Sequence, residues 1–283
     1  MSDAPDVQID SARPDMPYID GILDGIDHGG DVEGDVIWQR HLHWGYWEDP
    51  SQADGSPEDY AAAAERLTDL MFDTADVGND MRVIDCGCGI GGAVRSLNER
   101  ISGARITGVN IDERQLAVAR QKVVAEPGNE IDFVQADACA LPFKSNSADR
   151  ILAIECIFHF PSRARFLREA SRVLRPGGTL TITDIVPMAA ALPLLRKTQT
   201  SLTFYGESNS VPTPVSGYRV LARRAPLRIR DNVDITKQSL PTFDVLRRWC
   251  GRVDPEGADQ TDLMATYLRR GWMRYRLMSF EKD

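Results

Sequence analysis

Short apolar runs alternate with amphipathic segments from about residue 76 to the end of the chain. The apolar runs have the length of strands, and the segments between them repeat apolar positions three and four residues apart, as helices do. The pattern predicts strands over 82–86, 104–111, 131–136, 149–155, 178–185, 227–236 and 273–281, and helices over 91–101, 112–124, 162–174, 218–225 and 241–270, the last with a break near Gly251. Strands that alternate with helices favour an α/β fold built on a parallel sheet.

The segments outside this alternation are less regular. Residues 1–35 combine Asp, Gly and Pro with little periodicity, and we interpret them as a loosely ordered arm. An Ala-rich amphipathic helix is predicted over 60–72, and residues 188–217, which contain no clear strand, are interpreted as a lid. The chain thus divides into an N-terminal arm and helical cap over 1–75 and a core over 76–283.

Composition and charge narrow the classes of partner. The chain has 283 residues, 42% of them hydrophobic, which is enough for a full core. A formal net charge of -9 and the lack of a long Lys/Arg run argue against nucleic acid or a membrane surface as partner and favour a small molecule. No apolar run reaches the roughly 18 residues of a membrane helix. The five cysteines are odd in number, which favours reduced thiols. We therefore expect a soluble, cytoplasmic protein, with a homo-oligomer left open.

The run Val83–Gly92 is the most informative stretch of the sequence. It is typical of a buried strand that turns through glycines into a helix. Such turns bind nucleotides because the glycines let the backbone approach a ligand while the helix N-terminus faces it. Two ligands fit the spacing: Gly87, Gly89 and Gly92 satisfy the dinucleotide pattern G-x-G-x-x-G, whereas Gly87, Gly89 and Gly91 satisfy the G-x-G-x-G of S-adenosylmethionine enzymes.

Polar residues at three strand ends help to decide between a dinucleotide and S-adenosylmethionine as the ligand. Asp85 lies two residues before Gly87, where a carboxylate can receive the amino group of an amino-acid ligand. Asn110 ends the second strand, where an acidic residue would accept from both ribose hydroxyls, and its amide offers one acceptor and one donor. Asp137 follows the third strand, where a carboxylate can accept from an adenine amino group. Because the carboxyl ends of parallel strands meet in one crevice, we expect the three side chains to surround one adenosine.

With these motifs the chain resembles the class I S-adenosylmethionine-dependent methyltransferases. The resemblance rests on the glycine loop, the segments 110–116, 137–138 and 155–160, and the Leu-Arg-Pro-Gly-Gly turn over 174–178. It implies S-adenosylmethionine as the cofactor and a doubly wound, seven-stranded, mostly parallel sheet with an antiparallel last strand. Within the family the chain is most similar to small-molecule methyltransferases of bacterial secondary metabolism and antibiotic biosynthesis, such as those that methylate sugar hydroxyls of macrolides and indolocarbazoles.

The resemblance also carries a set of cofactor-binding residues. Besides the strand-end residues, the set is Gly87, Cys88, Gly89, Ile111, Gln115 and Ala138. Asn110 departs from the acidic residue usual in the family, which weakens the ribose assignment at that position. For Gln115, a solvated helix position is the alternative.

An aromatic cluster covers Trp38–Trp47 in a chain with only 7% aromatic residues. Resembling enzymes carry a similar His-x-Gly-Tyr-Trp stretch that closes the cofactor site, which implies that Tyr46 and Trp47 cover the cofactor. The alternative is a surface hairpin whose rings pack on the core.

No metal site is expected. His41, His43, Cys86 and Cys88 are the nearest candidates, but the two cysteines lie inside the glycine loop and neither pair has the usual ligand spacing.

Three residues are candidates for the chemistry. Glu155 and His159 follow the fourth predicted strand, which ends beside the methyl group in this fold. A near-neutral pKa suits His159 as the general base that takes the proton of an alcohol acceptor. Asp184, at the end of the neighbouring strand, is expected to orient His159, as in similar sugar O-methyltransferases, and Glu155 is the third candidate. The alternative for His159 is packing between Phe158 and Phe160.

The sequence therefore predicts methylation of a hydroxyl on a small, hydrophobic or glycosylated metabolite. The rival with the same cofactor is C-methylation of an isoprenoid, in which Glu155 and aromatic faces steady a carbocation. A nicotinamide-dependent oxidoreductase is disfavoured by Asp85 and by the lack of a Tyr-x-x-x-Lys pair. A non-catalytic adenosine-binding module is also disfavoured, because it would give His159 and Asp184 no role.

Overall fold

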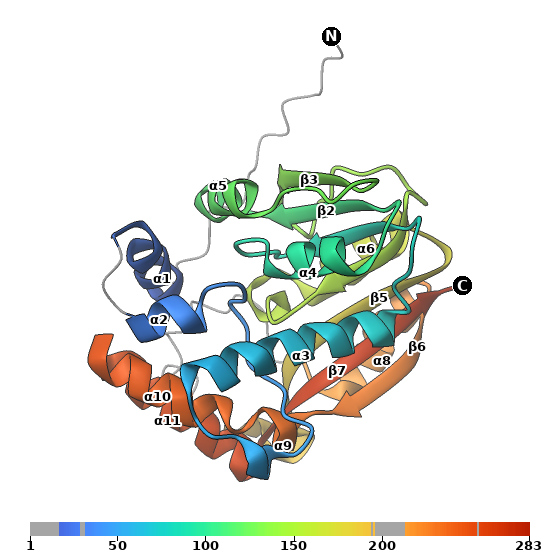
Figure 1. Ribbon diagram of the computed structural model, residues 1–283. Helices are drawn as coiled ribbons and strands as arrows, with labels where there is room; N and C mark the ends of the chain where they lie inside the picture. The colour runs from blue at the N-terminus through green and yellow to red at the C-terminus, as the bar shows by residue number, and fades with distance from the viewer. Residues whose placement is uncertain (1–16, 29–31, 194, 196–212, 254) are drawn as a thin grey trace.

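A seven-stranded sheet organises the described part of the chain, with the strand order β3-β2-β1-β4-β5-β7-β6 (Figure 1). The computed structural model describes residues 17–28, 32–193, 195, 213–253 and 255–283. The strands are β1 (Arg82–Cys86), β2 (Arg105–Asn110), β3 (Glu130–Gln135), β4 (Ala148–Ala153), β5 (Leu174–Pro187), β6 (Leu227–Asp234) and β7 (Met273–Lys282). β1 to β5 pair in parallel, whereas β7 runs antiparallel to both β5 and β6. The predicted fold class is confirmed, including the antiparallel last strand.

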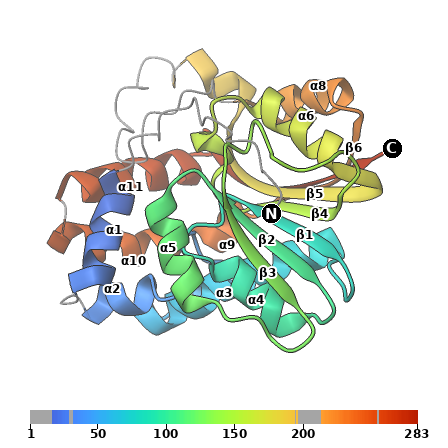
Figure 2. The same ribbon diagram turned by 90° about the horizontal axis from the view of Figure 1, so that it is seen from above.

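Helices cover both faces of the sheet. They are α1 (Pro17–His28), α2 (Val32–Ile37), α3 (Pro57–Ala75), α4 (Gly92–Arg100), α5 (Glu113–Lys122), α6 (Arg163–Val173), α8 (Val215–Arg224), α9 (Thr236–Ser239), α10 (Thr242–Val253) and α11 (Pro255–Arg269). α3, α4 and α5 pack on one face and α6 and α8 on the other (Figure 2). Among the described residues, no helix is long and apolar enough to cross a bilayer.

Alternate residues of the central strands supply two separate cores. In β1, Val83 belongs to the core under α3 and α4, while the next residue, Ile84, belongs to the core under α6 and α8. Both side chains are at most 5% exposed. Successive strand residues point to opposite faces, so a strand covered on both faces is apolar throughout. This explains why the run before the glycine loop lacks the polar alternation of a half-exposed strand.

Local signals explain most helix ends. The Ser56 side chain accepts a hydrogen bond from the Asp59 N–H at the start of α3, and Pro57 occupies the first helical position. The predicted break near Gly251 is misplaced: α10 continues to Val253, and α11 begins at Pro255. Proline has no N–H to donate into a preceding turn, so it starts a helix more readily than it continues one.

The N-terminal arm is more ordered than predicted, because α1 and α2 lie within it. Both helices lie beside α10 and α11 (Figures 1 and 2), where Arg252 forms an ion pair with Glu33 at 2.7 Å. Of the predicted lid over 188–217, residues 194 and 196–212 lie outside the described residues. Its described ends are a 3-10 turn, η3 (Ala189–Ala191), and the first residues of α8.

Candidate active site

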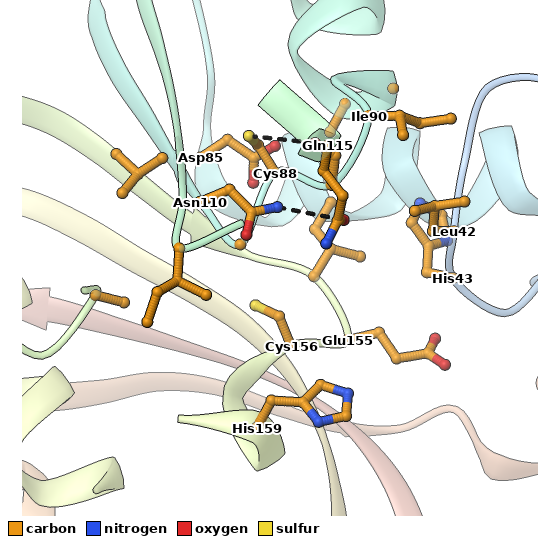
Figure 3. Close-up of a pocket in the computed structure, with 18 of the residues that line it drawn as sticks. Leu42, His43, Asp85, Cys88, Ile90, Asn110, Gln115, Glu155, Cys156 and His159 are labelled. Carbon is orange, nitrogen blue, oxygen red and sulfur yellow. Dashed lines mark hydrogen bonds between the residues drawn. The ribbon is translucent and has the colours of Figure 1, made fainter. Parts of the chain in front are cut away.

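A cavity lies at the carboxyl ends of β1, β2, β3 and β4 (Figure 3). Eleven of the residues expected to bind the cofactor or take part in the chemistry line it, and they come from four stretches of chain. They are Asp85, Gly87, Cys88, Gly89, Asn110, Ile111, Gln115, Asp137, Ala138, Glu155 and His159 besides the segment 40–43. The topology thus brings together strand ends that are up to 74 positions apart in the sequence, from Asp85 to His159.

The glycine loop forms one wall of this cavity and has no room for side chains. Gly87 has a φ of +76°, and a Cβ atom there would lie 2.6 Å from the Cys156 Sγ. Gly91 caps α4 in the left-handed conformation with a φ of 85°. A Cβ at Gly92 would clash with the Arg40 carbonyl oxygen. Glycine is therefore required both by backbone conformation and by the close approach of neighbouring segments.

Asp85 is the polar residue at the carboxyl end of β1. Its side chain lines the cavity, is 2% exposed, and receives no hydrogen bond from any described residue. Burial raises the pKa of the Asp85 carboxyl group to about 7. A buried carboxyl without an internal donor is suited to a cationic ligand group, which would restore the charged form.

Asn110 and Gln115 form a polar pair close to Asp85 and Cys88 (Figure 3). The Asn110 Nδ2 donates to the Gln115 Oε1 at 3.3 Å, and the Asn110 Oδ1 accepts from the Asp112 N–H at 3.2 Å. Gln115 is 3% exposed, so the alternative of a solvated helix position is wrong. Asp137 orders the next loop, because its Oδ1 accepts from the Cys139 N–H at 2.7 Å.

The aromatic segment lines the cavity with different residues from those predicted. Arg40, His41, Leu42 and His43 line it, whereas Tyr46 and Trp47 do not. The Trp47 indole N–H donates to the Asp59 Oδ2 at 2.8 Å, and its ring packs over Gly45. The structure thus places Tyr46 and Trp47, which were predicted to cover the cofactor, outside the lining of this cavity, because both residues belong to the packing of this segment on α3.

His41 and His43 lie together, with ring centroids 4.7 Å apart. His43 bonds to the Trp44 carbonyl oxygen and the Thr68 hydroxyl, both at 3.0 Å, and burial lowers the pKa of its imidazole to about 3. His41 contacts Glu65 at 2.7 Å. These partners fix the segment against α3. Across the described ranges, no group of three His, Cys, Asp or Glu side chains is arranged to hold a metal ion.

Glu155 ties the end of β4 to two distant segments. Its Oε2 accepts from the Trp44 N–H at 2.7 Å and from the Tyr275 O–H at 3.0 Å. Its own N–H donates to the Thr183 hydroxyl at 2.8 Å, and its φ of 52° turns the chain sharply. Burial raises the pKa of the Glu155 carboxyl to about 8, above its usual 4.5. Glu155 therefore holds the cavity wall together in a largely neutral form at pH 7.

His159 closes the 3-10 turn η2 (Ile157–His159) and lines the cavity below Glu155 and Cys156 in Figure 3. Its ring lies 4.4 Å from that of Phe158. Burial, followed by the charge of Arg163, lowers the pKa of the His159 imidazole to about 4. The imidazole is therefore neutral at pH 7, the form that accepts a proton.

Asp184 does not orient His159. Its Oδ2 and Oδ1 accept from the Arg163 guanidinium at 2.9 and 3.0 Å, and its Oδ2 accepts from the Tyr218 O–H at 2.6 Å. Asp184 is fully buried and Arg163 is 4% exposed. The expected pair with His159 is thus replaced by a buried network that joins β5, α6 and α8. The charge of Arg163 in this network lowers the pKa of the His159 imidazole.

Sequence reasoning missed the contribution of the arm. Ile19 of α1 lines the cavity and packs with Leu23 on Ile90 of the glycine loop. Asp20 forms an ion pair with Arg114 at 2.7 Å beside this contact. Ile19, Ile22 and Leu23 have the spacing of a helical apolar face, so a short periodic signal was present within the residues interpreted as loosely ordered.

Comparisons with known proteins agree with this arrangement. A family model described as a methyltransferase domain matches residues 84–182. Methyltransferase GfsG of Streptomyces halstedii is 36% identical over 219 residues, which cover 75% of this chain and 77% of that protein. The 27-O-demethylrifamycin SV methyltransferase of Amycolatopsis mediterranei is 35% identical over 162 residues, which cover 56% of this chain and 57% of that enzyme.

One solved structure shows the same fold with a different named reaction. Geranyl diphosphate C-methyltransferase from Streptomyces coelicolor A3(2), in complex with Mg2+, geranyl diphosphate and S-adenosyl-L-homocysteine, superposes with a TM-score of 0.69. The superposition covers 95% of this chain and 100% of that one, at 17% sequence identity. At this identity the similarity concerns the fold and leaves the acceptor atom open.

Proposed function

Because this chain belongs to the class I S-adenosylmethionine-dependent methyltransferases of secondary-metabolite type, we propose that it methylates a hydroxyl group. The proposed acceptor is a small, hydrophobic or glycosylated secondary metabolite of an antibiotic pathway. Two observations support the choice of acceptor atom. First, the 27-O-demethylrifamycin SV methyltransferase is named for an O-demethylated acceptor. Second, the neutral imidazole of His159 lines the same cavity as the glycine loop.

The cavity fits S-adenosylmethionine, which supplies an electrophilic methyl group on sulfur when bound. The fit rests on a glycine wall without room for side chains and on the Asp85 carboxyl, which no described residue satisfies. Asp85 would receive the amino group, Asn110 the ribose hydroxyls and Asp137 the adenine amino group. The Asn110 Oδ1 already accepts a hydrogen bond from the Asp112 N–H, so Asn110 can accept fewer hydrogen bonds from the ribose hydroxyls than a carboxylate could.

Binding of S-adenosylhomocysteine near pH 6.5 is expected to release about 0.5 to 0.8 proton per site. The pKa of Asp85 is about 7 without a ligand, so the carboxyl is mostly protonated at this pH. A ligand ammonium beside it favours the carboxylate, lowers its pKa and expels the proton. Calorimetric titrations in buffers of different ionisation enthalpy measure this release. Asp85→Asn should abolish it, and Glu155→Gln should leave it in place. A binding enthalpy that is independent of the buffer argues against the role of Asp85.

His159 is the group that we assign to the proton of the acceptor hydroxyl. It follows β4, on the side of the cavity that faces away from Gln115 in Figure 3. Methyl transfer to an alcohol requires that the hydroxyl lose its proton, and a buried neutral imidazole takes it without a competing water molecule. The low pKa makes His159 a weak base in the empty cavity. A buried neutral base nevertheless remains competent across the whole neutral pH range.

C-methylation has less support from the same site. In the C-methylation considered from the sequence, an ionised carboxylate near the reacting carbon helps to stabilise the carbocation. Glu155 has a pKa of about 8 and accepts hydrogen bonds from Trp44 and Tyr275, so it is largely protonated and committed to the wall of the cavity. These observations favour oxygen over carbon as the acceptor.

Paired acceptors test the proposed function. The full chain is incubated with methyl-labelled S-adenosylmethionine and hydroxylated macrolactones or their glycosides, each also supplied with the target hydroxyl capped as a methyl ether. Label transfer is expected only to the free hydroxyl compounds. Transfer to capped acceptors at an equal rate would exclude O-methylation as the main reaction.

A further inference from the structure

A second, narrower cavity adjoins the first, and of the residues assigned to cofactor binding or chemistry only Glu155 lines it. It lies between α1, the segment 38–44, α10 and α11. Trp38, Trp44, Leu246 and Trp249 give it aromatic and apolar walls. Leu42 and Glu155 border both cavities, and Figure 3 shows these two side chains at the edge of the first one. The two cavities therefore meet at these two side chains.

One buried polar group in this second cavity lacks a partner. Trp38 is 8% exposed, and its indole N–H meets no hydrogen-bond acceptor in the described part of the chain. Its ring is held edge-on against Trp249 and Tyr60, with centroids 5.4 and 6.1 Å away. A buried donor is costly to leave unsatisfied, and tryptophan at a binding site commonly combines an apolar contact with one hydrogen bond. The N–H is therefore a candidate contact for a ligand oxygen.

We propose that the second cavity holds the apolar body of the methyl acceptor, and that the Trp38 indole N–H donates to a carbonyl or ether oxygen of that body. This assignment rests on the proposed function, since it supplies the acceptor whose hydroxyl reaches His159. It narrows the acceptor class to molecules with an apolar or aromatic portion that carries an oxygen without a proton. A strongly anionic acceptor is disfavoured, because the cavity offers no basic side chain among its lining residues.

The test measures binding, without turnover, in the full chain saturated with S-adenosylhomocysteine so that the first cavity is filled. The probe is prodan, a naphthalene dye whose propionyl carbonyl changes its emission when it accepts a hydrogen bond. Wild-type protein should bind prodan with the emission of a buried, hydrogen-bonded carbonyl. Trp38→Phe should weaken binding about tenfold and shift the bound emission to the blue, because the ring remains while the donor is lost.

Two further variants keep the test decisive. Cys250→Leu fills the second cavity from α10 and should also weaken prodan binding. Trp272→Phe makes the same substitution at a half-buried tryptophan that lines neither cavity, and it should bind prodan like the wild type. Equal affinity of all four proteins, or prodan binding that S-adenosylhomocysteine displaces, would overturn the proposal. Because the assay reads binding alone, a failure of O-methylation with the paired acceptors leaves its result unaffected.

Discussion

The His159→Ala variant is expected to lose about 10²- to 10⁴-fold in kcat while its affinity for S-adenosylhomocysteine stays within about twofold. A positioned base contributes this factor because the acceptor hydroxyl otherwise keeps its proton until late in the transfer. The cofactor side of the cavity, around Asp85 and Asn110, does not depend on the imidazole, so cofactor binding should be unaffected. Single-turnover transfer and calorimetric binding measure the two effects separately.

Rescue by added imidazole distinguishes the loss of a general base from damage to the cavity in the His159→Ala variant. Added imidazole should restore part of the activity of His159→Ala, because the truncated side chain leaves space for it beside Phe158. His159→Gln keeps a polar side chain of similar size and should remain as inactive as His159→Ala. Nearly full activity in both variants would assign His159 a packing role, the alternative considered from the sequence.

Replacing Asp184 is expected to destabilise the protein strongly. Asp184→Asn should lower the free energy of unfolding by about 3 kcal/mol, because it leaves the Arg163 guanidinium buried without a compensating charge. Arg163 is 4% exposed and bonds to Asp184 and Tyr218, so water cannot replace the lost carboxylate. The Asp184 carboxylate also holds the pKa of Arg163 above its usual value despite burial. Denaturant unfolding followed by circular dichroism measures the change.

A surface pair serves as the control for this prediction. Asp262 lies 2.6 Å from Arg247, but both side chains are about half exposed, at 47% and 62%. Asp262→Asn should therefore cost at most about 1 kcal/mol. An Asp184→Asn variant that is as stable as Asp262→Asn but inactive would return Asp184 to a direct role in the chemistry.

The sequence brought together the residues that line the cavity around the glycine loop, because local signals determine their positions. A glycine that needs a positive φ, such as Gly87, and polar residues that end buried strands, such as Asp85 and Asn110, can be located from neighbours in the sequence alone. Parallel pairing then places these strand ends together. The element boundaries in this region accordingly differ from the prediction by one or two residues.

The acceptor side could not be derived in the same way, because long-range packing determines it. Asp184 bonds to Arg163 and Tyr218, which lie 21 and 34 positions away in the sequence, and nothing in their spacing indicates that they form a network. The aromatic segment shows the same limit. Its composition predicts a buried element, but only packing on α3 turns Trp47 toward Asp59 and leaves Leu42 facing the cavity.

The position of the transferred methyl group tests the central claim most directly. Carbon-13 methyl-labelled S-adenosylmethionine is incubated with the full chain and an accepted macrolactone, and the product is analysed by NMR. We expect one new methoxy carbon whose protons correlate through the oxygen to the carbinol carbon of the acceptor. A labelled methyl group bonded to carbon would contradict the account and assign the enzyme to C-methylation.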